Sequence, residues 1–352
     1  MHNQAKKPPP KPMPTASRPR AARATSYDVA QAAGVAQSTV SRCFQPGSHI
    51  SDDTREHVLA VAARLGYAPN ALARSLITRR SHAVGVLITR YTLRSAPALL
   101  YSLGDALARA GQHMILLAVD DDASVKPVLL GLRGYPLDGL IACATLDPAA
   151  VQGFTAHGVP VLFFNRSPGE TDADAVSTDH EAGARALAVG MLGAGRRCFL
   201  CLGGPAAAPV GRLRIDGFQA GLRAGGLSEA AVLDGGFSYD QAHAVFLDAV
   251  ARGARPDAIF CANDQMAMGV IDACRHVLGW KIPDEVMVAG FDDVPEGARA
   301  PYRLTTVRQP IDAMARQAVE LLRQRRATPE RRPRRQRLPG EVIIRASAAW
   351  PE

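Results

Sequence analysis

Aromatic residues are scarce in this chain, and long apolar runs are missing from it. Only 5% of the 352 residues are Phe, Trp or Tyr, whereas 47% are hydrophobic, which is ample for a packed core. No run of ~18 apolar residues occurs, so the sequence predicts no membrane span. The N-terminal lysines are not followed by an apolar stretch, so no signal peptide is expected. We therefore expect a soluble protein of the cytoplasm.

Enzyme and metal-site motifs are missing as well. No GxGxxG follows the first strand-like run, Val84–Thr89, and neither GxxxxGKS/T nor GxSxG occurs. Cys198 and Cys201 form a CxxC, but their side chains would point to opposite faces of a strand, and no second CxxC or His pair accompanies them. Most cysteines lie in apolar runs, which predicts reduced, buried thiols, at positions 43, 143, 198, 201, 261 and 274. We expect no catalytic residue, no cofactor and no metal.

Acidic residues are absent from the first 24 residues, and the net charge of +8 is unevenly spread. Residues 1–24 carry +6, residues 322–337 carry +7 from eight arginines and Glu330, and residues 25–80 carry +2, so the remainder carries −7. Basic runs are most often solvated or disordered tails, and holding DNA phosphates is the alternative. Residues 1–24, rich in Pro, Ala, Lys and Arg, are expected to be disordered.

Two different patterns follow along the chain. Residues 25–67 predict three short helices, from Thr25 or Ser26 to Ala33, from Gln37 to Phe44, and from Ser51 to Gly66. From Val84 onward, strand-like and helix-like runs alternate, which predicts parallel sheets with helices on both faces, in two lobes. The expected strands are 84–89, 114–119, 139–144, 159–164, 198–202, 258–261 and 286–290. The expected helices are 98–110, 124–133, 148–157, 180–194, 211–225, 240–252, 263–278 and 311–323.

The first two helices fit a helix-turn-helix. Ala30 is small where the helices would cross, Gly34 allows the positive φ of the turn, and Val40 provides an apolar plug from the second helix. Gln37, Ser38 and Arg42 would face outward, and these residue types read base edges. On spacing alone, an ordinary three-helix subdomain remains open.

Two longer stretches resemble one family. TSYDVAQAAGVAQSTVSR and ISDDTREHVLAVAARLGYAPNALARSL are similar to the lactose-repressor and galactose-repressor family of bacterial transcription regulators, and the likeness continues to LPGEVIIRAS. The resemblance implies a helix-turn-helix headpiece with a hinge helix, followed by a two-lobed α/β domain like the periplasmic binding proteins. The implied boundaries are a basic tail over 1–24, a DNA-binding domain over 25–69, a hinge over 70–80, and an effector-binding and dimerisation domain over 81–352.

The resemblance also implies roles for individual DNA-binding residues. Gln37 and Ser38 match base-contact positions, and Arg42 matches an arginine of the recognition helix. Leu76 matches a leucine that wedges into the minor groove, which is plausible because an apolar wedge unstacks and kinks a base step. The other implied residues are Thr25, Ser41 and Asn70 near phosphates, and Ala73, which lets the hinge helix approach the groove.

Polar residues follow three of the expected strands, where parallel sheets bind ligands. They are Asn165-Arg166, Asn263-Asp264 and Asp292-Asp293, with Arg214 on a nearby helix. Such groups can bind sugar hydroxyls, although solvation or helix capping, by Asp264 in particular, is the alternative.

The resemblance implies that Arg214, Asn263 and Asp292 hold the effector and that Phe237 packs on a sugar face. Asn165 stands where relatives often have aspartate. The family's Asn-Pro-Phe-Tyr is missing at Leu93–Ala96, where Arg94 occurs, which puts a neutral sugar in doubt and favours considering a sugar acid or another organic anion.

The function that we predict is an allosteric repressor without enzymatic activity. It would bind a near-palindromic operator as a homodimer and respond to a small effector, with release from DNA and recruitment to DNA both open. A periplasmic-type binding protein is the alternative, against which the headpiece argues. The amphipathic helix 98–110 is a candidate dimer face through Leu99, Leu103, Leu107 and Ala110, and packing in the core is equally possible.

Overall fold

The computed structural model describes residues 24–45, 47–68, 80–132, 134–206 and 208–350. It divides into two compact units, Met1–Arg79 and Arg80–Glu352. The tail over 1–23 and the predicted hinge residues Asn70, Ala73 and Leu76 lie outside the described residues.

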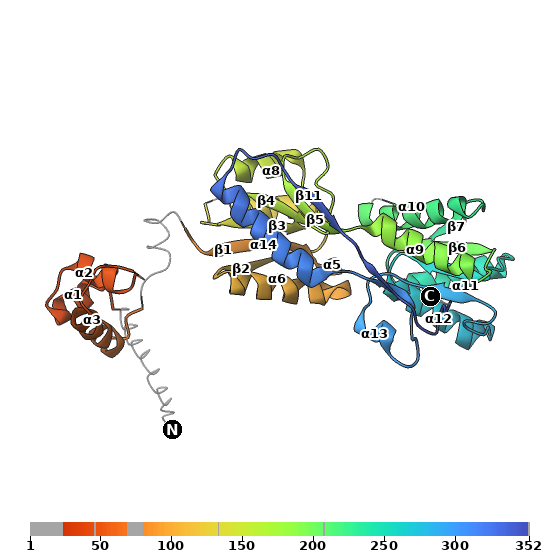
Figure 1. Cartoon of the computed structure of the whole chain (residues 1–352), viewed down its shortest axis with the longest axis horizontal. Coiled ribbons are helices and arrows are strands. Elements are labelled where there is room, and N and C mark those ends of the chain that lie inside the picture. The colour runs from red at the N-terminus through yellow and green to blue at the C-terminus, as the bar shows by residue number, and fades with distance from the viewer. Residues whose placement is uncertain (1–23, 46, 69–79, 133, 207, 351–352) are drawn as a thin grey trace, which may run out of the picture. The chain divides into compact units, whose positions relative to one another are not determined.

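The first unit is a bundle of three short helices (Figure 1), α1 (Ser26–Ala33), α2 (Gln37–Cys43) and α3 (Asp52–Arg64). Thr25 and Asp28 form a capping box at the start of α1, and Gly34 ends it with φ of 63°. Val40 is fully buried in the shared core, as the spacing predicted. The predicted helices are therefore confirmed to within one or two residues.

The second unit begins with an N-lobe built on a six-stranded parallel sheet of order β11-β5-β4-β3-β1-β2. Apolar side chains from α6 and α14 cover one face of this sheet, and those from α7 and α8 cover the other. The strands are β1 (Ala83–Thr89), β2 (His113–Val119), β3 (Gly139–Cys143), β4 (Val161–Phe164), β5 (Asp174–Thr178) and β11 (Arg335–Leu338). The helices are α5 (Arg90–Ser95), α6 (Pro97–Arg109), the short η1 (Asp122–Ser124), α7 (Val125–Gly131), α8 (Pro148–Thr155) and α14 (Ile311–Ala327).

The C-lobe has a four-stranded parallel sheet of order β7-β6-β8-β9. Side chains of α9 and α10 cover one face, and those of α11 and α12 cover the other. The strands are β6 (Phe199–Gly203), β7 (Ala231–Asp234), β8 (Ala258–Cys261) and β9 (Met287–Ala289), with an antiparallel pair of β10 (Thr306–Arg308) and β12 (Glu341–Ile343). The helices are α9 (His180–Gly193), α10 (Pro209–Ala224), α11 (Tyr239–Ala251), α12 (Asp264–Asp272), the π-helical η2 (Ala273–Leu278) and α13 (Pro295–Ala298).

The chain passes between the two lobes three times (Figure 1), after β5, after β10 and after β11. Each predicted strand occurs, but β5, β7, β10, β11 and β12 were not predicted. These strands have three to five residues, and β11 has the sequence RQRL, which has the composition of a basic tail. The alternative that residues 322–337 are a disordered tail is therefore wrong, because they form the end of α14, the start of β11, and a connecting segment whose Arg331 and Arg334 bind Asp174.

Two further expectations need correction. Leu99, Leu103 and Leu107 are buried in the core of the N-lobe, so packing within the chain explains the apolar face of α6 and these leucines are not a dimer surface. Five cysteines are buried free thiols, but Cys198 is exposed because it lies just before β6 rather than inside it. No helix among the described residues is long and apolar enough to cross a membrane.

Candidate functional site

Helix α2 presents a polar, acid-free surface. Val40 and Cys43 point into the core, which leaves Ser38, Ser41 and Arg42 exposed on the opposite side. Gln37 is half-buried, and its Nε2 donates a hydrogen bond to Ser26 Oγ over 3.2 Å, so α1 orients this side chain. The structure thus brings the four predicted α2 residues onto one short helix.

Two other contacts hold this surface in shape. The Thr25 side chain takes part in the capping box, where its Oγ1 donates to Asp28 over 2.8 Å. Arg55 of α3 donates to the Cys43 carbonyl over 2.8 Å and to the Ser48 carbonyl over 3.0 Å, which fixes the loop that follows α2. Sequence reasoning missed Arg55, because its acceptors are main-chain atoms at the end of α2 and in the loop that follows it.

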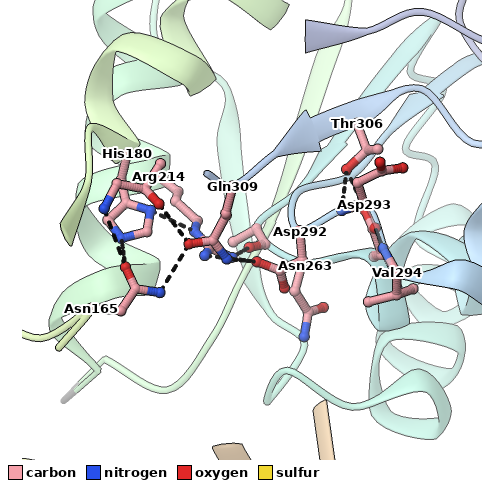
Figure 2. Close-up of polar contacts among 12 residues, drawn as sticks. Asn165, His180, Arg214, Asn263, Asp292, Asp293, Val294, Thr306 and Gln309 are labelled. Carbon is pink, nitrogen blue, oxygen red and sulfur yellow. Dashed lines mark hydrogen bonds and ion pairs between the residues drawn. The ribbon is translucent and has the colours of Figure 1, made fainter. Parts of the chain in front are cut away.

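The second site centres on the buried Arg214 of α10 (Figure 2). Its Nη2 lies 2.8 Å from Asp292 Oδ1, its Nη1 donates to the Ala262 carbonyl over 2.7 Å, and its guanidinium stacks on Phe291 at 4.0 Å. A guanidinium with a carboxylate partner and several acceptors can remain charged inside the protein. Arg214 is therefore the fixed positive charge of the site.

Asn165, His180 and Gln309 close a ring with this ion pair (Figure 2). Asn165 Nδ2 donates to Gln309 Oε1 over 2.9 Å, and Gln309 Nε2 donates to Asp292 Oδ1 over 2.7 Å. His180 Nε2 lies 3.0 Å from Asn165 Oδ1, and Arg214 Nε donates to His180 Nδ1 over 3.3 Å. The ring joins the N-lobe, through Asn165, to the C-lobe, through Arg214 and Asp292.

The charges in the ring follow from burial and neighbours. Burial, followed by the charge of Arg214, holds the pKa of His180 well below its usual range, so this imidazole is neutral. A neutral ring that accepts at Nδ1 carries its proton on Nε2 and donates to Asn165. Burial raises the pKa of Asp292, and the Arg214 and Gln309 donors oppose that shift.

Asp264 behaves differently from the expectation that it caps α12. Asn263 is the cap, since its Oδ1 accepts from the Met266 N–H over 2.9 Å. Asp264 accepts instead from the Val294 N–H over 2.8 Å and from Thr306 Oγ1 over 2.6 Å. Burial, followed by the charge of Asp292, raises the pKa of Asp264 to about 7. This carboxyl therefore fixes the strand-end loop that carries Asp292.

Phe237 and Asn263 form a second pair in the C-lobe. Asn263 Nδ2 donates to the Phe237 carbonyl over 3.2 Å. The Phe237 ring packs so closely on Gly204 and Gly211 that an added Cβ would meet it at 2.2 and 2.7 Å. Asn165, Phe237 and Asp292 also adopt positive φ values of 53°, 55° and 124°, a backbone conformation that is costly outside glycine and that clusters at binding sites.

The structure thus joins Asn165, Arg214 and Asp292 in one ring and links Phe237 to Asn263. Sequence reasoning missed His180 and Gln309. His180 follows β5 and Gln309 follows β10, and neither strand was recognised. A search for polar residues after every short β-branched stretch would have found both.

Comparisons with known proteins identify the family. Residues 25–70 match the model "Bacterial regulatory proteins, lacI family", and residues 190–348 match the model "Periplasmic binding protein-like domain". The ribose operon repressor of Bacillus subtilis (strain 168) is 30% identical over 303 residues, which cover 85% of this chain and 90% of the relative. This chain belongs to the LacI family.

Other relatives of this LacI-family protein agree. The ribose operon repressor of Escherichia coli (strain K12) is 28% identical over 330 residues, covering 92% of this chain and all of that protein. A lac repressor dimer, bound to operator and to the anti-inducer ONPF, superposes with a TM-score of 0.84 at 27% identity and covers 92% of this chain and 99% of that one. The predicted fold class is confirmed.

Family membership settles the class of function. The first unit is a helix-turn-helix domain, and the second is a periplasmic-binding-protein-like domain, so the chain is a DNA-binding transcription regulator and not an enzyme. The alternative of a binding protein without a DNA role is wrong, because residues 25–70 match the DNA-binding family.

Proposed function

We propose that this protein is a dimeric repressor of the bacterial cytoplasm that reads its operator with α2. Ser38 and Arg42 are exposed on that helix and Gln37 is oriented by Ser26, which supports base contacts by these three side chains. Thr25 and Ser41 would lie near phosphates. Asn70, Ala73 and Leu76 would form the hinge that enters the minor groove.

A dimer is part of the proposal because one short recognition helix reads only a few base pairs. A two-fold pair of headpieces doubles the contacts and requires a near-palindromic operator. Relatives named for repression of the ribose operon, and a lac repressor solved as a dimer on operator, support it. Exposed apolar side chains at one edge of the N-lobe, Tyr101 and Leu116, are the candidate dimer surface.

The effector site is the ring formed by Asn165, His180, Arg214, Asp292 and Gln309, with Phe237 and Asn263 beside it. The observation that carries the proposal is that these hydrogen bonds link one lobe to the other. A ligand that offers hydroxyls to Asp292 and Asn165 replaces bonds between the lobes with bonds of its own. It therefore favours one lobe arrangement over another, as an allosteric effector must. The proposed class is a sugar or sugar derivative.

Arg166 favours an anionic derivative within that class. Its Nε donates to the Cys143 carbonyl and its Nη2 donates to Thr92 Oγ1 over 2.9 Å, and no carboxylate partner occurs among the described residues. A guanidinium with only neutral partners at the strand ends of the N-lobe can bind a carboxylate or phosphate. Thermal unfolding with matched pairs, such as glucose and gluconate, tests this choice, and stabilisation by the neutral member alone would contradict it.

One experiment with two variants tests the proposed function. Arg42→Ala should weaken operator binding by about 1–3 kcal/mol and keep the effector response. Asp292→Asn should keep operator binding and respond only at much higher effector concentration, since it loses charge-assisted acceptor capacity. Both are measured by titrating effector against a preformed operator complex. An unchanged effector response in Asp292→Asn would remove this residue from the site.

A further inference from the structure

A dense group of arginines lies at one edge of the N-lobe sheet. The six strands are parallel, so their amino ends share one edge, and the chain enters the second unit there through Arg80 and Ser81. Helix α14 ends at Ala327, and residues 328–334 lead to the amino end of β11. Residues 323–335 carry seven arginines against Glu330, whereas the chain after residue 80 and outside 322–337 carries a net charge of −7. The basic edge therefore belongs to an otherwise acidic body.

Two of these arginines are structural. Arg325 Nε lies 3.2 Å from Asp174 Oδ2, and Arg331 binds both oxygens of the same carboxylate, over 2.8 and 2.6 Å. Asp174 also accepts from the Arg334 N–H over 2.7 Å. These bonds hold the segment 328–334 in one conformation against the sheet, so the neighbouring arginines are displayed on a fixed scaffold.

A third arginine ties this edge to the chain that arrives from the DNA-binding unit. Arg326 forms an ion pair with Asp138, which precedes β3. The other oxygen of Asp138 accepts from the Ser81 N–H over 2.9 Å and from Ser81 Oγ over 3.0 Å. Asp138 therefore links Arg326 at the end of α14 to Ser81 at the start of the second unit.

Three further arginines are exposed and have no carboxylate partner among the described residues. The Arg332 side chain has no hydrogen bond or ion pair within that part of the chain. Arg334 Nη1 donates to Gln324 Oε1 over 3.0 Å, and Arg335 Nη2 donates to the Gly169 carbonyl over 3.0 Å. Their positive charges are thus not neutralised by the protein.

We propose that this arginine edge, formed by Arg332, Arg334 and Arg335, is a second DNA-binding surface that holds backbone phosphates of duplex beyond the base pairs read by α2. Guanidinium groups bind phosphate oxygens with charge-assisted hydrogen bonds. The segment between Ala68 and Arg80 spans at most about 40 Å when fully extended, which limits how far DNA held by the headpiece can lie from the chain that enters this edge. The inference rests on DNA binding by the first unit and is independent of the effector.

The test is the salt dependence of binding by the full-length protein to a fluorescent duplex of mixed sequence that extends beyond the two-fold site on both sides. Removing one phosphate-binding charge reduces the magnitude of the negative slope of log K against log salt by about one. Arg332→Ala/Arg334→Ala should reduce this magnitude by about two per protomer and weaken binding several-fold at low salt. Arg185→Ala/Arg316→Ala, which removes the same charge from exposed positions elsewhere, should leave the slope unchanged.

A variant that is expected to bind DNA more tightly controls for misfolding, because a misfolded protein would lose binding and not gain it. Glu330→Gln removes the one acidic residue of the segment and should tighten binding and steepen the slope. Equal slopes for Arg332→Ala/Arg334→Ala and its control, or no effect of Glu330→Gln, would overturn the arginine edge. A wild type that fails to bind duplex at all would instead contradict the proposed function, so the two failures are distinguishable.

Discussion

Asp174 in the N-lobe and Asp264 in the C-lobe are both fully buried carboxylates, yet they ionise in opposite ways. Asp174 opens β5 and binds two guanidinium groups, Arg325 and Arg331. Asp264 opens α12 and accepts only from neutral groups, the Val294 N–H and Thr306. Burial opposes ionisation in both. Arg331 and Arg325 outweigh it and lower the pKa of Asp174, whereas nothing outweighs it at Asp264, whose pKa rises to about 7.

The difference shows that two guanidinium partners can keep a buried carboxyl ionised, whereas neutral donors do not. Asp174 contributes stability above its ordinary pKa of 3.8 and loses that contribution as the pH falls below it. Asp264 has a raised folded pKa, so it costs stability as the pH rises from about 4 towards 7. The first carboxylate holds parts of the N-lobe together, and the second is accommodated near Asp292 of the hydrogen-bonded ring.

The largest loss in the free energy of unfolding is expected when the Asp174 carboxylate is removed. Asp174→Asn leaves Arg325 and Arg331 buried without a counter-charge, and removing one partner of a buried ion pair costs about 3–5 kcal/mol. Urea unfolding at neutral pH measures this loss as a lower midpoint. Asp248→Asn, at an exposed pair with Arg252, is the control and should cost less than about 1 kcal/mol. Equal midpoints for the two variants would contradict the role of burial.

A smaller, pH-dependent effect is expected at Asp264. Asp264→Asn cannot ionise, so the variant should gain roughly 2–4 kcal/mol relative to wild type as the pH rises from 4 to 8. The amide can still accept from the Val294 N–H, which keeps the loop contact. Unfolding curves for both proteins across this range give the difference directly. A difference that stays constant with pH would show that Asp264 is ionised throughout.

Local signals explain how much of the fold could be predicted from the sequence. The signals from Gly34, Val40 and the Thr25 cap act within one or two helical turns, so the helices of the first unit could be predicted. Strands β1, β3 and β8 are continuous apolar runs, so they could be predicted as well. The missed strands β5, β10 and β11 are short and partly polar. The pairs β11–β5 and β10–β12 each join chain segments that are separated by a passage through the other lobe.

The same reason limits the candidate sites. Arg214 and Asp292 stand on or beside elements that were recognised, so their convergence was expected. His180 and Gln309 follow unrecognised strands, and their roles appear only when the lobes are assembled. Arg325 and Asp174 are 151 positions apart in the sequence, so the sequence gives no sign of their ion pair. The arginine-rich segment was therefore interpreted as a basic tail.

The smallest change in the free energy of unfolding is expected at Glu320. This residue has the hydrogen-bond geometry of a strong ion pair but is not buried, so it tests geometry without burial. Its carboxylate accepts from Arg323 Nε and Nη2, each over 2.7 Å, a geometry as good as that at Asp174. The hydrogen bonds from Arg323 and then Gln324 lower the pKa of Glu320 to about 2. However, the Arg323 side chain is 70% exposed, so water and salt screen the pair and little stability follows. Glu320→Gln should therefore change the free energy of unfolding by less than about 1 kcal/mol, and less still in high salt. A loss as large as that of Asp174→Asn, measured in the same urea titration, would mean that bidentate geometry alone stabilises these carboxylates and that burial is not the deciding difference.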